Sequence, residues 1–479
     1  MGEEITRSSF SAEEFQRFRQ HLNEETQQLE QWFQDNALSP DAGVCGLELE
    51  GWLLDRDWQA AAENEAFLQG LNDPLVVPEL SRFNFEINTT PQPRHARMFK
   101  RIHRQLRDIW GRCKQQADTL GLVPLQIGIL PTLKDDVMTV ENMSPLQRYH
   151  ALNEQVLVHR HGTPLNIDIS GDHDRLQVVH HDVMTEAATT SLQIHIQLDN
   201  ERAVRFYNAA HVLAAPMVAS CANSPYLFGQ ELWEESRIPL FEQSVSVPAF
   251  HDREGHLIER ATFGTRYVQD SLMEIFRENR DFFPVLLPAL HPDGAHRLAH
   301  LRLHNGTIWR WNRPLVDFDG QGRPTLRLEH RVTPAGPSLP DVIANILFFY
   351  GLIHYLADLA DAPEHRLAFE HNVANFYQAA RHGMAATVFW LDGHEHELRE
   401  LLLGELVPAA AHTLGELGID REDIDTYLHA IVAARLRSGQ TGSAWQKRFV
   451  ARHGRDFQNL TRAYYCQQQR QVPVHQWTI

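Results

Sequence analysis

The hydrophobic and polar residues of this chain alternate at period two in four segments, and this alternation predicts four β-strands. The segments are residues 46–51, 79–88, 191–198 and 325–332. Because successive side chains of a strand point to opposite faces of a sheet, each segment has one apolar face and one polar face. We therefore expect the apolar faces to pack on a core, while the other side of the sheet carries polar groups.

Helical periodicity dominates other parts of the chain. Ser11 and Glu14 fit a capping box and precede apolar residues at helical spacing, which predicts an N-terminal helix. Residues 94–120 and 205–221 have the same character, and the chain after Pro340 is rich in helix formers.

A β-hairpin is predicted at residues 301–309. Asn305-Gly306 stands there between two short alternating runs. Asn-Gly favours a two-residue turn because both residues tolerate a positive φ, so we expect the chain to reverse at this pair.

The predicted elements define an α+β fold in three parts. Residues 1–40 form an N-terminal helix, residues 41–340 form a catalytic antiparallel-sheet core with helices, and residues 341–479 form a mainly helical part integrated with the core. The boundary near residue 340 rests on a shift in composition, and the chain has no internal repeat.

Composition limits the class of partner. The chain has 479 residues, of which 43% are hydrophobic, so it can bury a large core. Its formal net charge of -18 provides no basic surface for many phosphates, and we expect small-molecule substrates and no nucleic-acid partner.

Cysteine usage and the N-terminus indicate the compartment. Cys45, Cys113, Cys221 and Cys466 are widely spaced, which favours a reducing compartment and argues against a zinc–thiolate site. The N-terminus lacks a signal-peptide pattern, and no apolar run approaches the ~20 residues that span a bilayer. We expect a cytoplasmic protein without a membrane partner.

The polar faces of the predicted strands carry carboxylates, amides, an imidazole and a guanidinium, but no lysine. They comprise Glu48, Glu50, Asn84, Glu86, Asn88, Gln193, His195, Glu329 and Arg331. A solvent-facing sheet would alternate in the same way. A concave sheet lining a cleft, however, needs this set, with carboxylates for a metal and arginines for phosphate. Because hard oxygen ligands suit Mg²⁺ or Mn²⁺, we favour a cleft that holds a metal and a nucleotide.

Common nucleotide and nucleophile motifs are absent. The sequence contains no G-x-x-x-x-G-K-[ST], G-x-G-x-x-G or G-x-S-x-G, so P-loop, dinucleotide-binding and serine-hydrolase interpretations lose their main support. A nucleotide must be held in another way.

Four motifs, in this order, resemble the glutamate–cysteine ligase family, in the branch that includes bacterial carboxylate–amine ligases. They are Gly46-Leu47-Glu48-Leu49-Glu50, Glu79 followed by Glu86-Ile87-Asn88-Thr89-Thr90-Pro91, Ala222-Asn223-Ser224-Pro225-Tyr226 running to Arg237, and Leu328-Glu329-His330-Arg331-Val332-Thr333-Pro334. The resemblance implies a glutamine-synthetase-like fold, in which a curved antiparallel sheet forms a funnel with helices packed outside. It also implies that ATP and more than one Mg²⁺ ion bind inside the funnel.

The resemblance further implies a reaction. ATP would phosphorylate a substrate carboxylate, and an amine would attack the acyl phosphate to form an amide. Glutamate and cysteine are the first expected substrates, which would place the protein in glutathione biosynthesis. The alternatives are a guanidino phosphotransferase on a related fold and a catalytically inactive nucleotide-binding regulatory protein.

Positions matching the family motifs receive roles from the resemblance. The metal ligands would be Glu48, Glu50, Glu79, Glu86 and Glu329. Arg331 would lie near the transferred phosphate and act with Glu329 in catalysis. Arg237, Asn223 and Asn88 would bind substrate.

One strand departs from the family pattern. Many members have His-x-His where this chain has Gln193-Ile194-His195. Gln193 and His195, together with Arg331, would bind the cofactor. Either Gln193 supplies a neutral amide ligand, or the metal is displaced toward His195.

Overall fold

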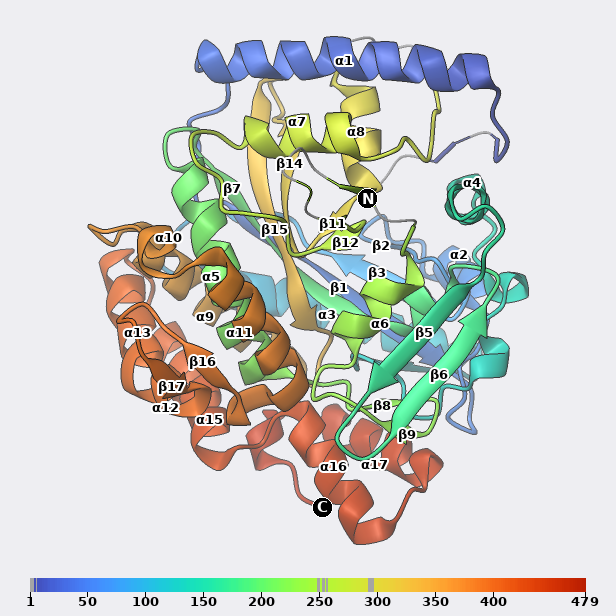
Figure 1. Ribbon diagram of the computed structural model, residues 1–479. Helices are drawn as coiled ribbons and strands as arrows, with labels where there is room; N and C mark the ends of the chain where they lie inside the picture. Colours follow the sequence, from blue (N-terminus) through green and yellow to red (C-terminus); the bar gives the residue numbers. More distant parts are fainter. Residues whose placement is uncertain (1–3, 6, 248–249, 252–254, 256, 292–296) are drawn as a thin grey trace.

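A curved antiparallel sheet forms the centre of the computed structural model, which describes residues 4–5, 7–247, 250–251, 255, 257–291 and 297–479 (Figure 1). The strand order is β14-β15-β7-β1-β3-β2, and β4 pairs with β1 off this path. The strands are β1 (Cys45–Leu54), β2 (Val76–Pro78), β3 (Asn84–Asn88), β4 (Val123–Leu125), β7 (Ser191–Leu198), β14 (Asn312–Phe318) and β15 (Pro324–Pro334). The predicted α+β class with a curved antiparallel sheet is confirmed.

Helices surround this sheet (Figure 1). The longer ones are α1 (Ala12–Gln34), α2 (Asn64–Leu71), α3 (Met98–Thr119), α4 (Gln147–His159), α5 (Ala203–Cys221), α6 (Arg237–Ser244), α7 (Met273–Phe282), α8 (Ala299–Gly306), α9 (Leu339–Ala357), α11 (Phe369–His382), α13 (Val407–Glu416), α16 (Gly442–His453) and α17 (Phe457–Gln469). The short ones are α10 (Pro363–Arg366), α12 (Leu398–Leu401), α14 (Arg421–Asp423) and α15 (Ala434–Ser438), with π-helical turns at η6 (Leu402–Leu406) and η7 (Ile424–Ala433).

Several short elements connect these helices and strands. The two-stranded pairs are β5 (Leu165–Ser170) with β6 (Arg175–His180), β8 (Tyr226–Leu227) with β9 (Gln230–Glu231), β10 (Phe250–His251) with β11 (Leu257–Ile258), β12 (Ala261–Thr262) with β13 (Trp309–Arg310), and β16 (Thr387–Phe389) with β17 (Glu395–Glu397). The 3₁₀ turns are η1 (Asp135–Val137), η2 (Val140–Asn142), η3 (Met184–Ala188), η5 (Gly383–Ala385) and η8 (Val474–Gln476). Of these, η3 leads directly into β7 and bears on the site.

The N-terminal helix α1 begins where the capping box predicts. The Glu14 backbone N–H donates to Ser11 Oγ at 3.3 Å, and the Ser11 backbone N–H donates to Glu14 Oε2 at 2.8 Å. The buried Glu25 carboxylate accepts hydrogen bonds from His300 Nδ1 at 2.6 Å and from the Leu301 backbone N–H at 2.7 Å. Helix α1 is thereby joined to α8, which lines the central cavity.

The predicted hairpin at residues 301–309 is wrong, because this segment contains helix α8 and only then the short strand β13. Asn305 lies in the helix, where its side chain donates to Pro314 O at 2.9 Å and accepts from Asn279 Nδ2 at 2.8 Å. Packing of α8 against α1 and α7 overrides the local turn preference of Asn-Gly.

The predicted strand at residues 79–88 is shorter than expected. The chain between β2 and β3 turns, and β3 begins only at Asn84, so Glu79 lies in the turn and not on a strand. Glu86 lies on β3 as predicted.

Helix α9 corrects the expectation that no apolar run could span a bilayer. Its 19 residues have a mean hydropathy of 1.4, and the apolar window is 89% buried. Helices α5 and α13 pack against it, which is the environment of a core helix.

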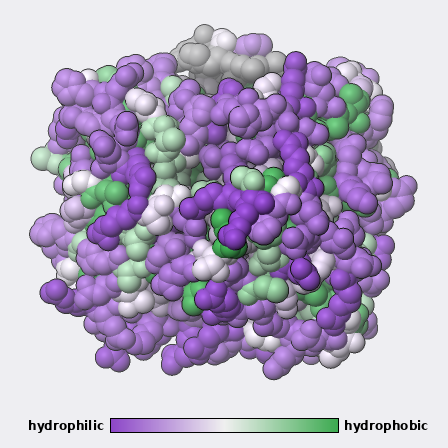
Figure 2. All heavy atoms as spheres, turned by 90° about the horizontal axis from the view of Figure 1, so that it is seen from below, coloured by the Kyte–Doolittle hydropathy of each residue, from purple (hydrophilic) through white to green (hydrophobic). Residues whose placement is uncertain are grey.

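Figure 2 shows one face of the molecule, on which hydrophilic residues predominate and hydrophobic residues form small scattered groups among the described residues.

Candidate active site

The register of the central strands gathers the acidic side chains. Strand β1 runs between β3 and β7, and its Glu50 stands directly opposite Glu86 on β3. On the other side of the sheet's centre, His195 of β7 stands opposite Glu329 of β15. Side chains at these paired positions point to one face, so carboxylates that lie far apart in the sequence meet there.

Two separate groups of possible metal ligands result. Glu50, Glu79 and Glu86 form the first, which we call the carboxylate triad, and the ligand atoms within it lie within 4.8 Å of one another. Glu48, His195 and Glu329 form the second, which we call the histidine triad, at the same spacing. The five acids assigned to metal from the sequence are thus divided between two triads, with His195 as the added ligand.

The carboxylate triad holds concentrated negative charge. Burial, together with the charge of Glu79, raises the pKa of Glu50 to about 7. Burial and the carboxylates of Glu48 and Glu79 raise the pKa of Glu86 well above its ordinary value. A hard divalent cation would offset this repulsion, and the all-oxygen donor set fits Mg²⁺ or Mn²⁺.

The histidine triad combines two carboxylates with an imidazole. His195 Nε2 lies 3.3 Å from Glu48 Oε1 and 3.8 Å from Glu329 Oε1. Burial opposes ionisation of Glu48, but the neighbouring His195 holds the pKa of Glu48 well below its ordinary value. Both ring nitrogens of His195 are buried without a hydrogen-bond partner among the described residues, which fits a ligand role for this imidazole.

Gln193 links the two triads. Its Nε2 donates to Glu50 Oε1 at 2.9 Å, and its Oε1 accepts a hydrogen bond from Arg331 Nη1. Because Arg331 engages the carbonyl oxygen, the geometry favours His195 over Gln193 as the metal ligand on this strand. Gln193 instead orients Glu50 and Arg331.

Two arginines surround Glu329. Arg313 donates from Nε to Glu329 Oε2 at 2.7 Å and from Nη2 to Glu329 Oε1 at 3.0 Å, a bidentate pair. Arg331 Nη1 lies 3.4 Å from Glu329 Oε2. Burial opposes ionisation, but Arg313 and then Arg331 lower the pKa of Glu329 to about 2. Glu329 is therefore ionised throughout the neutral range.

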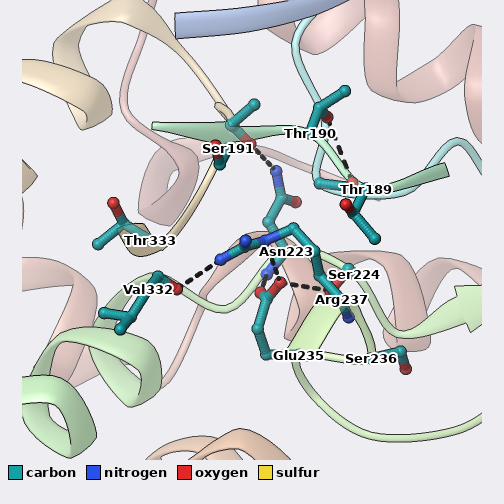
Figure 3. A network of polar contacts seen from close by, with 12 residues as sticks. Thr189, Thr190, Ser191, Asn223, Ser224, Glu235, Ser236, Arg237, Val332 and Thr333 are labelled. Carbon is teal, nitrogen blue, oxygen red and sulfur yellow. Dashed lines mark hydrogen bonds and ion pairs between the residues drawn. The ribbon is translucent and has the colours of Figure 1, made fainter. Parts of the chain in front are cut away.

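Arg237 is buried at the start of α6 and lines a small pocket beside the carboxylate triad. Figure 3 shows its guanidinium extending toward Val332. Its Nε donates to Glu235 Oε1 at 3.2 Å, and its Nη2 donates to Val332 O at 2.6 Å. The guanidinium is thus fixed by protein contacts at the pocket, and its contact with a substrate carboxylate stays a prediction.

Asn223 and Asn88 occupy different environments. Asn223 is buried, and its Nδ2 donates to Ala335 O at 2.8 Å and to the Tyr464 hydroxyl at 2.9 Å, so the geometry favours a scaffolding role over the expected substrate contact. Asn88 Nδ2 donates to Glu86 Oε1 at 2.8 Å and orients that carboxylate.

A cavity of about 250 Å³ borders residues of both triads. Its lining includes the acids Glu48, Glu50, Glu79, Glu86 and Glu329 together with Arg313 and Arg331. Its apolar lining residues include Leu152, Val183, Val245, Leu287, Leu301, Leu303 and Trp309. The smaller pocket with Arg237, Phe241 and Trp311 adjoins it, because Glu50, Glu79, Glu186 and Arg331 line both spaces. Such a site can hold a ligand that has both a charged part and an apolar part.

Sequence reasoning did not find Arg313 and Glu186. Arg313 stands opposite Glu329 in the pairing of β14 with β15, so only the strand register shows that it reaches this carboxylate. Glu186 lies on η3, outside any alternating segment. No motif in the sequence distinguishes it from a surface acid.

The fold and the site together define a class of protein, the ATP-dependent carboxylate–amine ligases. The chain belongs to glutamate–cysteine ligase family 2, whose model matches residues 44–464. The family predicted from the four motifs is therefore confirmed. No curated protein sequence matches the chain.

Two solved structures share the fold. The glutamate–cysteine ligase of Francisella tularensis in complex with AMP has a TM-score of 0.54 and 12% sequence identity, and the match covers 90% of this chain and 89% of that one. A bifunctional glutathione synthetase from Pasteurella multocida has a TM-score of 0.57 and 13% identity, with 91% of this chain and 54% of that chain covered. At these identities the likeness is one of fold.

Proposed function

We propose that this protein joins glutamate to an amine in an ATP-dependent reaction that passes through an acyl phosphate, with cysteine as the first expected amine. The observation that carries the proposal is that the two triads lie beside one cavity and that Arg331 connects them. Arg331 contacts Glu329 directly and reaches Glu50 through Gln193. Phosphoryl transfer depends on this kind of positioning and electrostatic stabilisation.

The two triads fit resident divalent cations. Glu50, Glu79 and Glu86 would hold one ion, and Glu48, His195 and Glu329 would hold another. Bound there, Mg²⁺ or Mn²⁺ would offset the negative charge of ATP phosphates.

The protein's own residues have distinct tasks in this proposal. Arg331 stabilises the transferring phosphoryl group, and Arg313 keeps Glu329 ionised and oriented. Arg237 receives a carboxylate of the substrate in the small pocket. The apolar side chains that line the cavity suit a nucleotide base, and the AMP in the Francisella tularensis ligase supports the use of an adenine nucleotide by this chain.

We also propose that the protein works in the cytoplasm. All four cysteines are free thiols, and three of them are buried. This agrees with a reducing compartment.

The test supplies ATP and Mg²⁺ with glutamate and a panel of amines, and it measures ADP formation together with the product mass. The proposal predicts ADP only when carboxylate and amine are both present, and a product whose mass equals their sum less water. A phosphorylated guanidine as product would instead identify a phosphotransferase. Absence of ADP, combined with a melting temperature that ATP and Mg²⁺ do not raise, would contradict the nucleotide site itself.

A further inference from the structure

Glu186 occupies the junction between the cavity and the small pocket. It lies on η3, just before β7, and its backbone oxygen accepts hydrogen bonds from the Thr189 backbone N–H at 2.9 Å and from Thr189 Oγ1 at 2.8 Å. These bonds fix the turn that carries the side chain. Its carboxylate lines both spaces, as do Glu50, Glu79 and Arg331.

The carboxylate of Glu186 differs from the other acids of the site in having no assigned partner. Asp317 pairs with Arg302 and Arg327. The remaining acids of the cavity, Glu48, Glu50, Glu79, Glu86 and Glu329, all belong to a triad. Among the described residues, Glu186 alone of the cavity's acids has neither an ion pair nor a place in a triad.

The environment of Glu186 favours a bound cation. Burial, followed by the charges of Glu79 and Glu50, raises the pKa of this carboxyl to about 8. A cationic ligand beside it would reverse this effect by stabilising the ionised form.

Other residues of the small pocket can bind the remainder of an organic substrate. They include Arg237, Phe241 and Trp311. The Trp311 indole N–H donates to Glu242 Oε1 at 2.8 Å, and the Arg237 guanidinium lies 5.7 Å from the Trp311 ring centroid. These side chains are therefore fixed in orientation, and a carboxylate in the same pocket complements a substrate that arrives as an ammonium ion.

We propose that Glu186 binds the ammonium group of the amine substrate and holds its nitrogen beside the carboxylate that is activated at the triads. The proposal rests on the ligase function proposed above and assigns to Glu186 a substrate contact that no motif indicates. A metal ion is the competing cation. The position of Glu186 outside both triads favours the amine.

The test compares Glu186→Gln with the wild-type protein on two nucleophiles, cysteine and hydroxylamine. Cysteine presents an ammonium group, whereas hydroxylamine is mostly neutral at weakly alkaline pH and needs no carboxylate to hold a charge. We expect the KM for cysteine to rise by about 10- to 100-fold, because the variant loses one hydrogen bond to a charged group. Hydroxamate formation should stay near the wild-type rate. Glu154→Gln, an exposed acid on α4, is the matched control and should change neither rate.

Other outcomes have definite meanings. An unchanged KM for cysteine in Glu186→Gln would overturn the proposal, and so would an altered Mg²⁺ requirement with the cysteine KM unaffected. If wild-type protein forms neither amide nor hydroxamate, the ligase function fails instead. We expect the amide variant to fold, because the amide has nearly the size of the carboxyl group and adds no charge beside Glu79 and Glu50. Should it not fold, Glu186→Asp retains the charge and should give a smaller rise in the cysteine KM with hydroxylamine unaffected.

Discussion

Glu50 and Glu86 stand directly opposite each other on β1 and β3, and both are buried. The pKa of each carboxyl is raised, first by burial and then by neighbouring carboxylates. Folding the chain therefore brings negative charges together before any cation is bound. From this relationship we expect the stability of the protein to depend on pH and on divalent metal.

The first prediction concerns that pH dependence. Unfolded Glu50 ionises near 4.5, while the folded group keeps its proton up to about 7, so the folded state binds more protons between these values and Glu50 lowers stability as pH rises. In chelator-treated protein, Glu50→Gln should remove this contribution. The melting temperature of the variant should therefore exceed that of the wild-type protein by a margin that grows from about pH 5 to about pH 7.

Addition of metal provides the complementary measurement. Mg²⁺ or Mn²⁺ should raise the wild-type melting temperature more at the higher pH, because the ligands must be ionised to bind. A metal response that is equal at both pH values would contradict the role assigned to the carboxylate triad.

A second prediction concerns catalysis. Glu86→Ala should abolish measurable turnover without unfolding the protein, because it removes a ligand from the triad and relieves charge repulsion. ADP formation and the far-ultraviolet circular dichroism spectrum measure the two effects. Turnover at the wild-type rate would refute the metal role of Glu86.

Arg331 gives a separate kinetic prediction. Loss of one preorganised electrostatic contact in a transition state costs about 10²–10³ in kcat. We expect Arg331→Met to show a decrease of this size, with a smaller change in the KM for glutamate. Arg107→Met, an exposed position on α3, is the control. A change confined to KM would place Arg331 in substrate binding and not in phosphoryl transfer.

The ion pair between Arg313 and Glu329 leads to a prediction about the free energy of unfolding. Arg313→Met leaves the ionised Glu329 with one fewer cation, and breaking a buried pair costs about 3 kcal/mol. Urea unfolding measures the change. The double variant Arg313→Met with Glu329→Gln should recover part of the loss, because the buried charge is then also removed. Additive losses in the double variant would show that the pair is not coupled.

Gln193 leads to a prediction about metal affinity. Loss of a residue that orients a metal ligand typically weakens metal binding by about 10- to 100-fold. We expect Gln193→Leu to raise the Mn²⁺ dissociation constant by such a factor, and titration calorimetry would measure it. An unchanged constant would show that Gln193 does not orient Glu50.

Sequence reasoning identified features that depend on local order. Ser11 and Glu14 predict the start of α1, and the alternation around Glu48 and His195 predicts which side chains share a face. The family motifs then place the acids in one site. These features succeed because capping and period-two alternation are encoded over a few residues.

Features that depend on long-range packing were not predicted. Asn305-Gly306 favours a turn locally, but contacts with α1 and α7 place it in a helix. The division of the acids into two triads follows from strand register, which sets Glu50 against Glu86 and Glu329 against His195. Arg313 could not be paired with Glu329 without that register.

The most direct test of the account follows an oxygen atom. Glutamate whose side-chain carboxylate carries a heavy oxygen isotope is supplied with ATP, Mg²⁺ and the amine that supports the fastest ADP formation. If the carboxylate attacks the terminal phosphate of ATP, one labelled oxygen must leave with phosphate when the amine displaces it, and mass spectrometry should find one heavy oxygen in each inorganic phosphate. Amide formation with unlabelled phosphate would contradict the acyl-phosphate route.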